Sequence, residues 1–265
     1  FEKMLYDNAL LALAYLEAFQ ATGNADFERV ARDILRWLER DMTSPEGAFY
    51  SATDADSPAP DGRREEGWFF TWTPAEIDAA LAPAASRLVK AFYAVTPEGN
   101  FEGRNVLHTP RPLAAVAAEQ GLGEAQARTQ LDAARERLYA ARARRPAPLR
   151  DDKILVAWNG LAISALARAS QIWSAAVPAA LDENRRAEDP PPPPSRQPSL
   201  PEPAYATAAS RAADFILARM QTDGRLRRSF AAGQARHDAY LEDYAFFIAG
   251  LLDLYEATGE PRWLA

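Results

Sequence analysis

"DNALLALAYLEAFQATGNADF", the stretch from Asp7 to Phe27, recurs in altered form near the other end of this chain. The second copy, "DYAFFIAGLLDLYEATGEPRW", runs from Asp243 to Trp263 and aligns with the first without a gap. A weaker third copy, "VAWNGLAISALARAS", runs from Val156 to Ser170. In the first two copies an apolar segment ends in Ala-Thr-Gly, and Gly commonly ends a helix in the left-handed conformation. Repeats of this kind predict a fold built from recurring helical units.

Each repeat predicts a helical hairpin. Its first helix is apolar nearly all round, which indicates burial on every side. Its second helix has one apolar and one charged face, which places one face in water. These two helix types predict two concentric layers, as in an α/α toroid, and a stacked solenoid is the alternative. We predict inner helices at Phe1–Ala21, Ile154–Trp173 and Tyr240–Thr258, and outer helices at Phe27–Met42 and Tyr205–Met220.

The segments between the hairpins predict smaller elements. "GAFYSATDADS" (Gly47 to Ser57) and "GWFFTWT" (Gly67 to Thr73) are aromatic and β-branched, and we expect them to pair as a small β-hairpin. Thr73 is a candidate N-cap, followed by a Pro at the first helical position. Further helices are predicted at about 111–120 and 123–143.

Two segments are interpreted as solvated. Residues 177–203 include five consecutive prolines, which cannot join a helix or a central strand, so we predict a flexible insertion within the hairpin. A proline-motif ligand is the alternative. The Arg-rich stretch "RERLYAARARRPAPLR", from Arg135 to Arg150, is interpreted as the solvated face of a helix running into a loop.

Composition excludes several classes of protein. The 265 residues are 48% hydrophobic, which is enough to form a large core. The net charge of −7 repels phosphate backbones, so we expect no nucleic-acid partner. The absence of cysteine excludes disulfides and thiolate sites, and two histidines exclude a His-rich metal site. No apolar run reaches the roughly 18 to 20 residues that span a bilayer, and no signal peptide is visible, so we expect no membrane partner and a cytoplasmic location. The missing initiator Met suggests a fragment.

Five motifs in this order resemble the spermatogenesis-associated protein 20 family of thioredoxin-domain-containing proteins. They are "FEKMLYDNA" (from Phe1), "DADS…EEGWFFTWT" (from Asp54), "GNFEGRNVL" (from Gly99), "RDDKILVAWNGL" (from Arg150) and "LEDYAFFIAGLLDLYEATG" (from Leu241). The resemblance implies an N-terminal thioredoxin-like domain upstream of Phe1 and a six-hairpin, glycosidase-like α/α toroid. About nine helices are expected here, fewer than the twelve of a closed ring, so we predict one incomplete toroid domain over 1–265, with a small β-hairpin insertion.

Parallel inner helices bring their N-terminal ends to one rim of a toroid, where loops and helix dipoles meet. Carboxylates beside Trp and Tyr are what a neutral polyol needs, because aromatic faces stack on its C–H surface and carboxylates bind hydroxyls and move protons. We therefore name four candidate catalytic acids: Asp7, Glu102, Asp152 and Asp243. The candidate substrate-binding residues are Tyr6, Asn8, Trp68, Trp72, Asn105, Lys153, Trp158, Asn159 and Tyr244.

Each of these signals has a simpler structural explanation. Asp7 and Asp243 could be helix caps, a role worth about 0.5 to 2 kcal/mol each. Asp54 and Asp56 could bind calcium, although a solvated loop is the simpler interpretation, and no metal or cofactor is predicted. The histidines that related epimerase toroids use as an acid/base pair are not reproduced by His108 and His237. Two hypotheses remain: a toroid that binds or acts on carbohydrate, and a non-catalytic protein- or peptide-binding toroid serving the thioredoxin-like domain.

Overall fold

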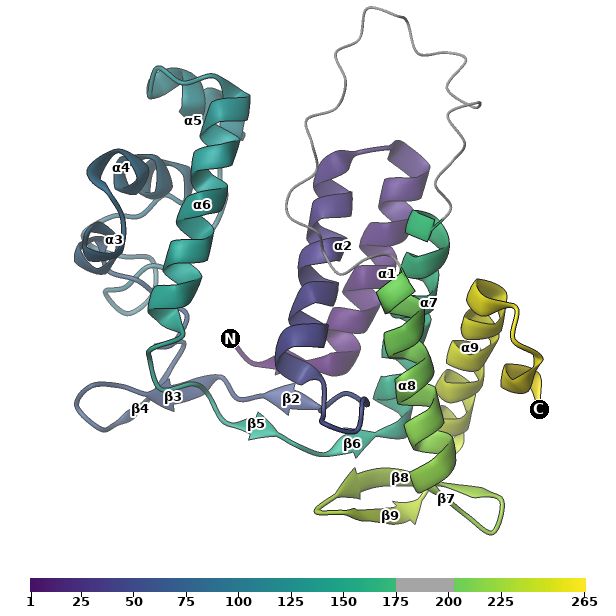
Figure 1. Ribbon diagram of the computed structural model, residues 1–265. Coiled ribbons are helices and arrows are strands. Elements are labelled where there is room, and N and C mark those ends of the chain that lie inside the picture. Colours follow the sequence, from purple (N-terminus) through teal and green to yellow (C-terminus); the bar gives the residue numbers. More distant parts are fainter. Residues whose placement is uncertain (175–202) are drawn as a thin grey trace, which may run out of the picture. The chain divides into compact units, whose positions relative to one another are not determined.

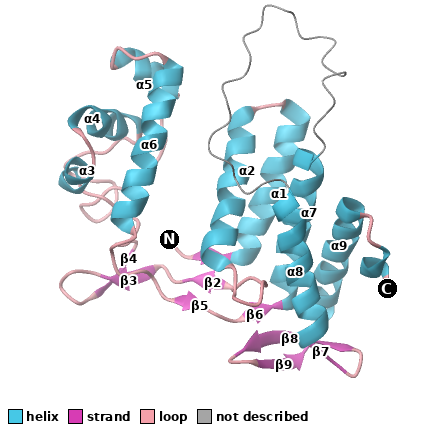
Figure 2. Ribbon diagram, viewed as in Figure 1, coloured by secondary structure: helices cyan, strands magenta, loops and turns pink. Residues whose placement is uncertain are grey.

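The computed structural model describes residues 1–174 and 203–265, which are mostly helical with several small sheets (Figure 2). The chain divides into two compact units, each with its own hydrophobic core. The first unit comprises residues 1–2 and 54–149, and the second comprises 3–53 and 150–265. Within these described ranges the chain forms nine α-helices. The predicted insertion at 177–203 lies, except for Pro203, outside them.

The second unit contains the repeated hairpins. Its helices are α1 (Leu5–Thr22), α2 (Ala25–Trp37), α7 (Val156–Ser174), α8 (Pro203–Arg219) and α9 (Leu241–Thr258) (Figure 1). Helix α7 packs against α1, α8 and α9, while α2 packs on α1. The predicted pairing of each apolar helix with an amphipathic one is therefore confirmed for α1 with α2 and for α7 with α8. A π-helical turn (Leu38–Met42) follows α2, and a 3₁₀ turn, η3 (Pro261–Leu264), packs on α9.

Local signals explain where these helices end. Gly23 and Gly259 follow α1 and α9 with φ of +67° and +70°, the left-handed conformation that Gly adopts without a Cβ clash. Each donates its N–H at 2.7 Å to the carbonyl four residues earlier. Asn24 then caps α2, because its side-chain oxygen accepts the N–H of Asp26 at 2.9 Å. The predicted role of the Ala-Thr-Gly motif is confirmed.

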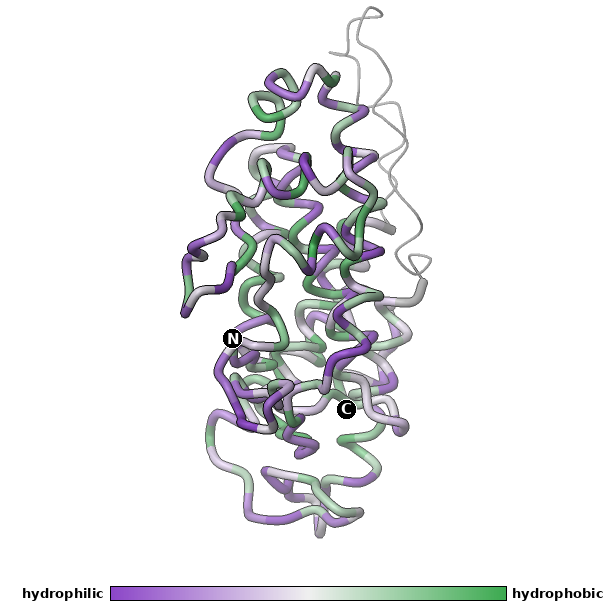
Figure 3. The backbone as a smooth tube through the Cα atoms, turned by 90° about the vertical axis from the view of Figure 1, so that its left-hand side faces the viewer, coloured by the Kyte–Doolittle hydropathy of each residue, from purple (hydrophilic) through white to green (hydrophobic). Residues whose placement is uncertain are grey.

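Burial differs among the three apolar helices. Helix α7 is enclosed, with only a few half-buried positions, as predicted. The prediction of burial on every side is wrong for α1 and α9. Leu10 of α1 is 49% exposed, and Ile248 and Leu252 of α9 are 53% and 49% exposed. The physical reason is the set of neighbours: α7 packs against three helices, α1, α8 and α9, whereas α1 packs against α7 and α2, and α9 packs mainly against α7. Figure 3 shows hydrophobic and hydrophilic residues interspersed along the backbone.

Small sheets lie beside these helices. One sheet joins β1 (Lys3–Met4), β2 (Ala52–Thr53) and β5 (Arg150–Asp151), all antiparallel. A second joins β6 (Ile154–Leu155), β7 (Gln221–Thr222), β8 (Arg225–Ala231) and β9 (Gln234–Asp238). The sequence interpretation missed the hairpin of β8 and β9. Its turn has positive φ at both Ala232 and Gly233, the conformation of a two-residue type I′ hairpin, and the Gly was the available signal.

The first unit contains α3 (Pro74–Ala80), α4 (Pro83–Phe92), α5 (Leu113–Glu119) and α6 (Glu124–Arg142). The predicted cap of α3 is confirmed, since Thr73 accepts the N–H of Glu76 at 3.2 Å and Glu76 accepts the N–H of Thr73 at 2.7 Å. A β-hairpin is present, but its strands are β3 (Asp56–Pro58) and β4 (Arg64–Glu66). The predicted partner at 67–73 is instead mostly a turn, because Gly67, at φ +70°, reverses the chain there.

Candidate functional site

The N-terminal ends of three helices in the second unit are joined by direct contacts. Tyr6, in the first turn of α1, contacts Trp158, in the first turn of α7, with 4.8 Å between ring centroids and 58° between ring planes. Asp243, in the first turn of α9, accepts the N–H of Ala157 of α7 at 3.2 Å. We call this group, with the neighbouring Asp7, the rim. The predicted convergence of these helix starts is therefore observed within this unit.

Asp243 is the buried centre of the rim, only 1% exposed. One carboxylate oxygen accepts the Ala157 N–H, and the other accepts the N–H of Tyr240 at 2.8 Å and Arg228 Nη1 at 3.2 Å. It therefore caps its own helix and the start of α7 at once, which satisfies N–H groups that helix starts otherwise leave unpaired. This structural role accounts for an acid in the first turn of α9.

Arg228, on β8, carries the balancing charge. Its Nη1 donates to Glu242 at 2.9 Å, and its guanidinium lies 4.7 Å from the centroid of the Tyr240 ring. This hydrogen bond lowers the pKa of the Glu242 carboxyl and raises the pKa of Arg228. Tyr244 also binds β8, because its hydroxyl accepts the N–H of Leu226 at 3.1 Å. The start of α9 is thus tied to the second sheet.

The two candidate asparagines bind backbone. Asn8 donates to the Met4 carbonyl at 2.8 Å. Asn159 is fully buried and accepts the N–H of Phe49 at 2.8 Å while donating to the Phe49 carbonyl at 2.9 Å. It also donates to the carbonyl of Leu155 at 3.0 Å. Asn159 therefore acts like a strand partner for Phe49 and fixes that loop to α7.

The remaining acids of this unit differ in their partners. Asp152 accepts Arg150 Nε at 2.6 Å, and Lys153 Nζ lies 3.0 Å from a carboxylate oxygen of Asp151, all on an exposed surface. Asp7 is exposed, and within residues 1–174 and 203–265 its carboxylate has neither a hydrogen bond nor an ion pair. The expected capping role is therefore not observed for Asp7: α1 begins at Leu5, and its N-cap residue, Met4, provides no side-chain cap.

The other candidates lie in the first unit. Glu102 is exposed in a tight turn with φ +47°. Asn105 is 1% exposed, accepts the N–H of Thr96 at 3.0 Å and donates to the carbonyls of Trp72 and Thr96 at 3.1 and 3.0 Å. Its side chain is used to connect two loops. Glu102, by contrast, has a solvent-facing position.

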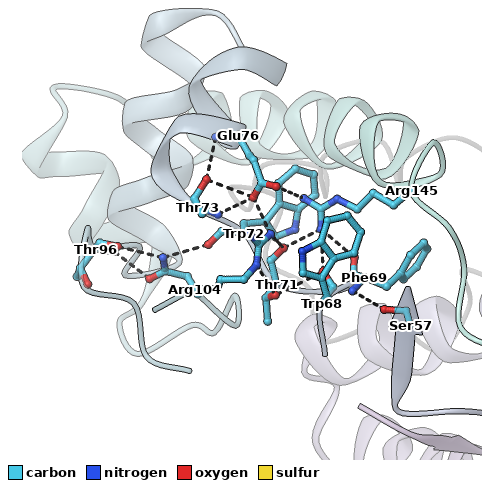
Figure 4. A network of polar contacts seen from close by, with 11 residues as sticks. Ser57, Trp68, Phe69, Thr71, Trp72, Thr73, Glu76, Thr96, Arg104 and Arg145 are labelled. Atoms are coloured by element: carbon cyan, nitrogen blue, oxygen red, sulfur yellow. Dashed lines mark hydrogen bonds and ion pairs between the residues drawn. The ribbon is translucent and has the colours of Figure 1, made fainter. Parts of the chain in front are cut away.

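Arg145 is a buried cation that the sequence interpretation missed (Figure 4). Its side chain is 10% exposed, and its guanidinium lies 4.2 Å from the ring centroid of Trp72. Nη1 donates to the carbonyls of Trp68, Phe69 and Thr71 at 3.2, 3.0 and 2.7 Å. Burial lowers the pKa of Arg145. The interpretation of the Arg-rich stretch as solvated is therefore wrong at this residue, because its carbonyl partners lie more than 70 residues earlier and leave no local signal.

Glu76 balances this charge. Its carboxylate lies 3.4 Å from Arg145 Nη2 and accepts Arg104 Nη2 at 2.7 Å, as Figure 4 shows. Arg104 also donates to the carbonyl and hydroxyl oxygens of Thr71, both at 2.9 Å. Trp68 and Trp72, both candidate ligand-binding residues, face a guanidinium group of the protein itself, because Arg145 lies 5.2 Å from the ring centroid of Trp68 and 4.2 Å from that of Trp72.

The possible calcium site has its own cation. Asp54 accepts the N–H of Asp56 at 3.2 Å and Arg64 Nη2 at 2.8 Å. Among the residues whose placement is described, no group of three or more His, Cys, Asp or Glu side chains could hold a metal ion. In the same part of the chain, every helix is too short or too polar to cross a bilayer.

Comparison with known proteins gives the family. No family model matches the chain. The whole chain is 36%, 34% and 33% identical to spermatogenesis-associated protein 20 of Homo sapiens, Rattus norvegicus and Mus musculus, respectively. A solved sugar epimerase from a ruminal bacterium aligns over 99% of this chain and 57% of its own at 13% identity, with a TM-score of 0.31, a likeness that decides neither fold nor function. The chain spans 34% of each of these three mammalian relatives. The family resemblance carried by its five motifs is therefore confirmed, and the chain is a homologue of spermatogenesis-associated protein 20 along its whole length.

Proposed function

We propose that this chain forms part of an α/α toroid and binds a neutral carbohydrate at the rim. The observation that carries the proposal is the Tyr6–Trp158 pair, two partly exposed aromatic rings, together with the exposed carboxylate of Asp7, which follows Tyr6 in the first turn of α1. Aromatic faces stack on the C–H surface of sugar rings, and a carboxylate accepts hydrogen bonds from hydroxyls. The helix pairs and the convergence of helix starts support the toroid.

Binding is better supported than cleavage. Glycoside hydrolysis requires two carboxyl groups about 5 to 9.5 Å apart, one able to give a proton and the other to act as base or nucleophile. In the second unit, both oxygens of Asp243 accept protein donors and Asp152 accepts Arg150. Asp7 is the candidate acid of this unit whose carboxylate is open to a ligand. We assign it the hydroxyl-binding role, and any proton transfer would begin there.

A second candidate function is a protein- or peptide-binding platform for a thioredoxin-like domain in a longer chain. Two exposed apolar residues of α9 favour it: Ile248 and Leu252, four residues apart and therefore on the same side of the helix, are 53% and 49% exposed. Contiguous exposed apolar residues commonly mark protein contacts.

Trp158→Ala tests the carbohydrate proposal. Binding of glucose, mannose, N-acetylglucosamine, maltose and cellobiose is measured by isothermal titration calorimetry. Loss of one stacking face should weaken a bound sugar by about tenfold, or roughly 1.4 kcal/mol. Tyr255→Ala, a partly buried aromatic at the other end of α9, is the matched control and should bind normally. The carbohydrate proposal is rejected if no sugar binds the wild-type protein, or if both variants lose affinity equally.

A further inference from the structure

Glu39 is a partly buried acid that the rim does not use. It lies in the π-helical turn Leu38–Met42 that follows α2. Single π-helical turns are rare and occur frequently at functional sites. Oxygen Oε1 of Glu39 is buried and, among the described residues, has no hydrogen-bond donor. A buried carboxylate oxygen without a donor favours the protonated form of the acid.

Arg211 of α8 is the charged group that acts on Glu39 from the neighbouring helix. Burial raises the pKa of Glu39 to about 7, and attraction to Arg211 opposes this effect only in part. Arg40 and Asp41, the charged neighbours in the same turn, bind each other at 2.6 Å. The stem of Arg211 also packs on the next loop, since a Cβ placed on Gly47 would lie 3.0 Å from Arg211 Cβ.

A short chain of contacts leads from this turn to the rim. The turn closes on the loop that follows, because Tyr50 donates its N–H to the carbonyl of Met42 at 2.8 Å. The same loop presents Phe49, whose N–H and C=O both bind Asn159 at the start of α7. Asn159 adjoins Trp158 in sequence. A shift of the loop at 43–49 would therefore act on the side chain of Asn159, the residue that follows the rim Trp158.

We propose that Glu39 is a proton-operated switch: loss of its proton loosens the loop at 43–49 from Asn159 and so weakens ligand binding at Trp158. The second half of this statement rests on the proposed carbohydrate function, whereas the first half does not. The sign follows from the cause. Below its ordinary pKa of 4.5 the Glu39 carboxyl is neutral in the closed and the opened loop alike, so its burial is tolerated. As the pH rises towards about 7 the opened loop loses this proton first, and above pH 7 the ionised form in the closed loop carries the full desolvation cost.

The test measures hydrogen exchange of the Phe49 amide, which needs no ligand, in the wild-type chain at pH 5.5 and 8.5. Protection, corrected for intrinsic exchange, should fall about threefold to tenfold between these pH values. Glu39→Gln should abolish the pH dependence because its amide does not titrate. Glu46→Gln removes an exposed carboxyl in the same loop and should leave the dependence intact.

Two further readouts keep the outcomes separate. Arg211→Gln removes the attraction and should move the midpoint of the Phe49 response to higher pH, which checks the switch if Glu39→Gln folds poorly. Sugar affinity should fall over the same pH range in wild type and not in Glu39→Gln. An unchanged Phe49 response in Glu39→Gln overturns the switch. Failure of every sugar to bind, with the Phe49 response intact, rejects the carbohydrate function and leaves the switch standing.

Discussion

At the scale of residues, the rim depends on one carboxylate that accepts three donors. Asp243→Asn keeps the size of the side chain but replaces one acceptor oxygen with an NH₂ group that faces N–H or guanidinium donors. We expect the free energy of unfolding to fall by about 1 to 3 kcal/mol, the cost of unmatched buried polar groups. Urea unfolding followed by circular dichroism measures this.

Glu242→Gln is the control for Asp243→Asn. Its carboxylate also binds Arg228, but it is exposed and screened by solvent, so Glu242→Gln should lower the free energy of unfolding clearly less than Asp243→Asn. Equal effects of the two substitutions would show that burial of Asp243 adds nothing to its role.

Arg145 provides the second prediction at this scale. Arg145→Lys keeps the positive charge but loses the planar guanidinium group that lies on the Trp72 ring and donates to three backbone carbonyls. We expect the first unit to lose about 2 kcal/mol of stability. Arg144→Lys, which changes an exposed neighbouring residue, should leave the stability of the first unit almost unchanged. Urea unfolding monitored by hydrogen exchange in α3 and α6 separates this unit from the other, and similar effects of both variants would contradict the assignment.

At the scale of elements, α7 and α9 approach so closely that two glycines are required. A Cβ on Gly160 would lie 2.5 Å from the backbone of Phe246, and one on Gly250 would lie 2.5 Å from the carbonyl oxygen of Gly160. Ser164 and Asp253 hydrogen-bond across the same interface. Because backbone cannot move aside as a side chain can, the two helices must separate to admit a methyl group.

Gly160→Ala should therefore destabilise the second unit by about 1 to 3 kcal/mol, despite the better helix propensity of Ala. Gly123→Ala is the matched control, because Gly123 has an ordinary φ of −71° and no atom within 4 Å of an added Cβ. Thermal unfolding of both variants gives the comparison. A Gly160→Ala chain as stable as the control would mean that the helices are less closely packed than the structure indicates.

At the scale of the whole molecule, the second unit is interrupted by the first. Thr53 of β2 and Arg150 of β5 face each other as an antiparallel pair, and between them the chain leaves to form residues 54–149. A two-residue Asn-Gly turn fits such a pair. Replacing 54–149 with Asn-Gly should leave a helical protein that unfolds cooperatively, because the second unit has its own core.

Circular dichroism and urea unfolding check this excision. The complementary piece, 54–149, should also fold alone, since Asp54 donates its N–H to the carbonyl of Leu149 at 2.8 Å and closes the segment on itself. Loss of cooperative unfolding in the excised chain would show that the two units depend on each other. That result would favour a single toroid domain covering residues 1–265 rather than two units that fold independently.

The sequence by itself determined the features that act within a few residues. The Gly after Ala-Thr predicted where α1 and α9 end, and the Thr73–Glu76 cap predicted where α3 begins, because these interactions span about one turn. Five motifs also identified the family. Only the tertiary structure decided that Asp243 receives an N–H from Ala157, that Arg145 stacks on Trp72, and that α9 exposes one face. Those outcomes depend on which distant segments become neighbours, and residue spacing along one helix carries no record of its neighbours.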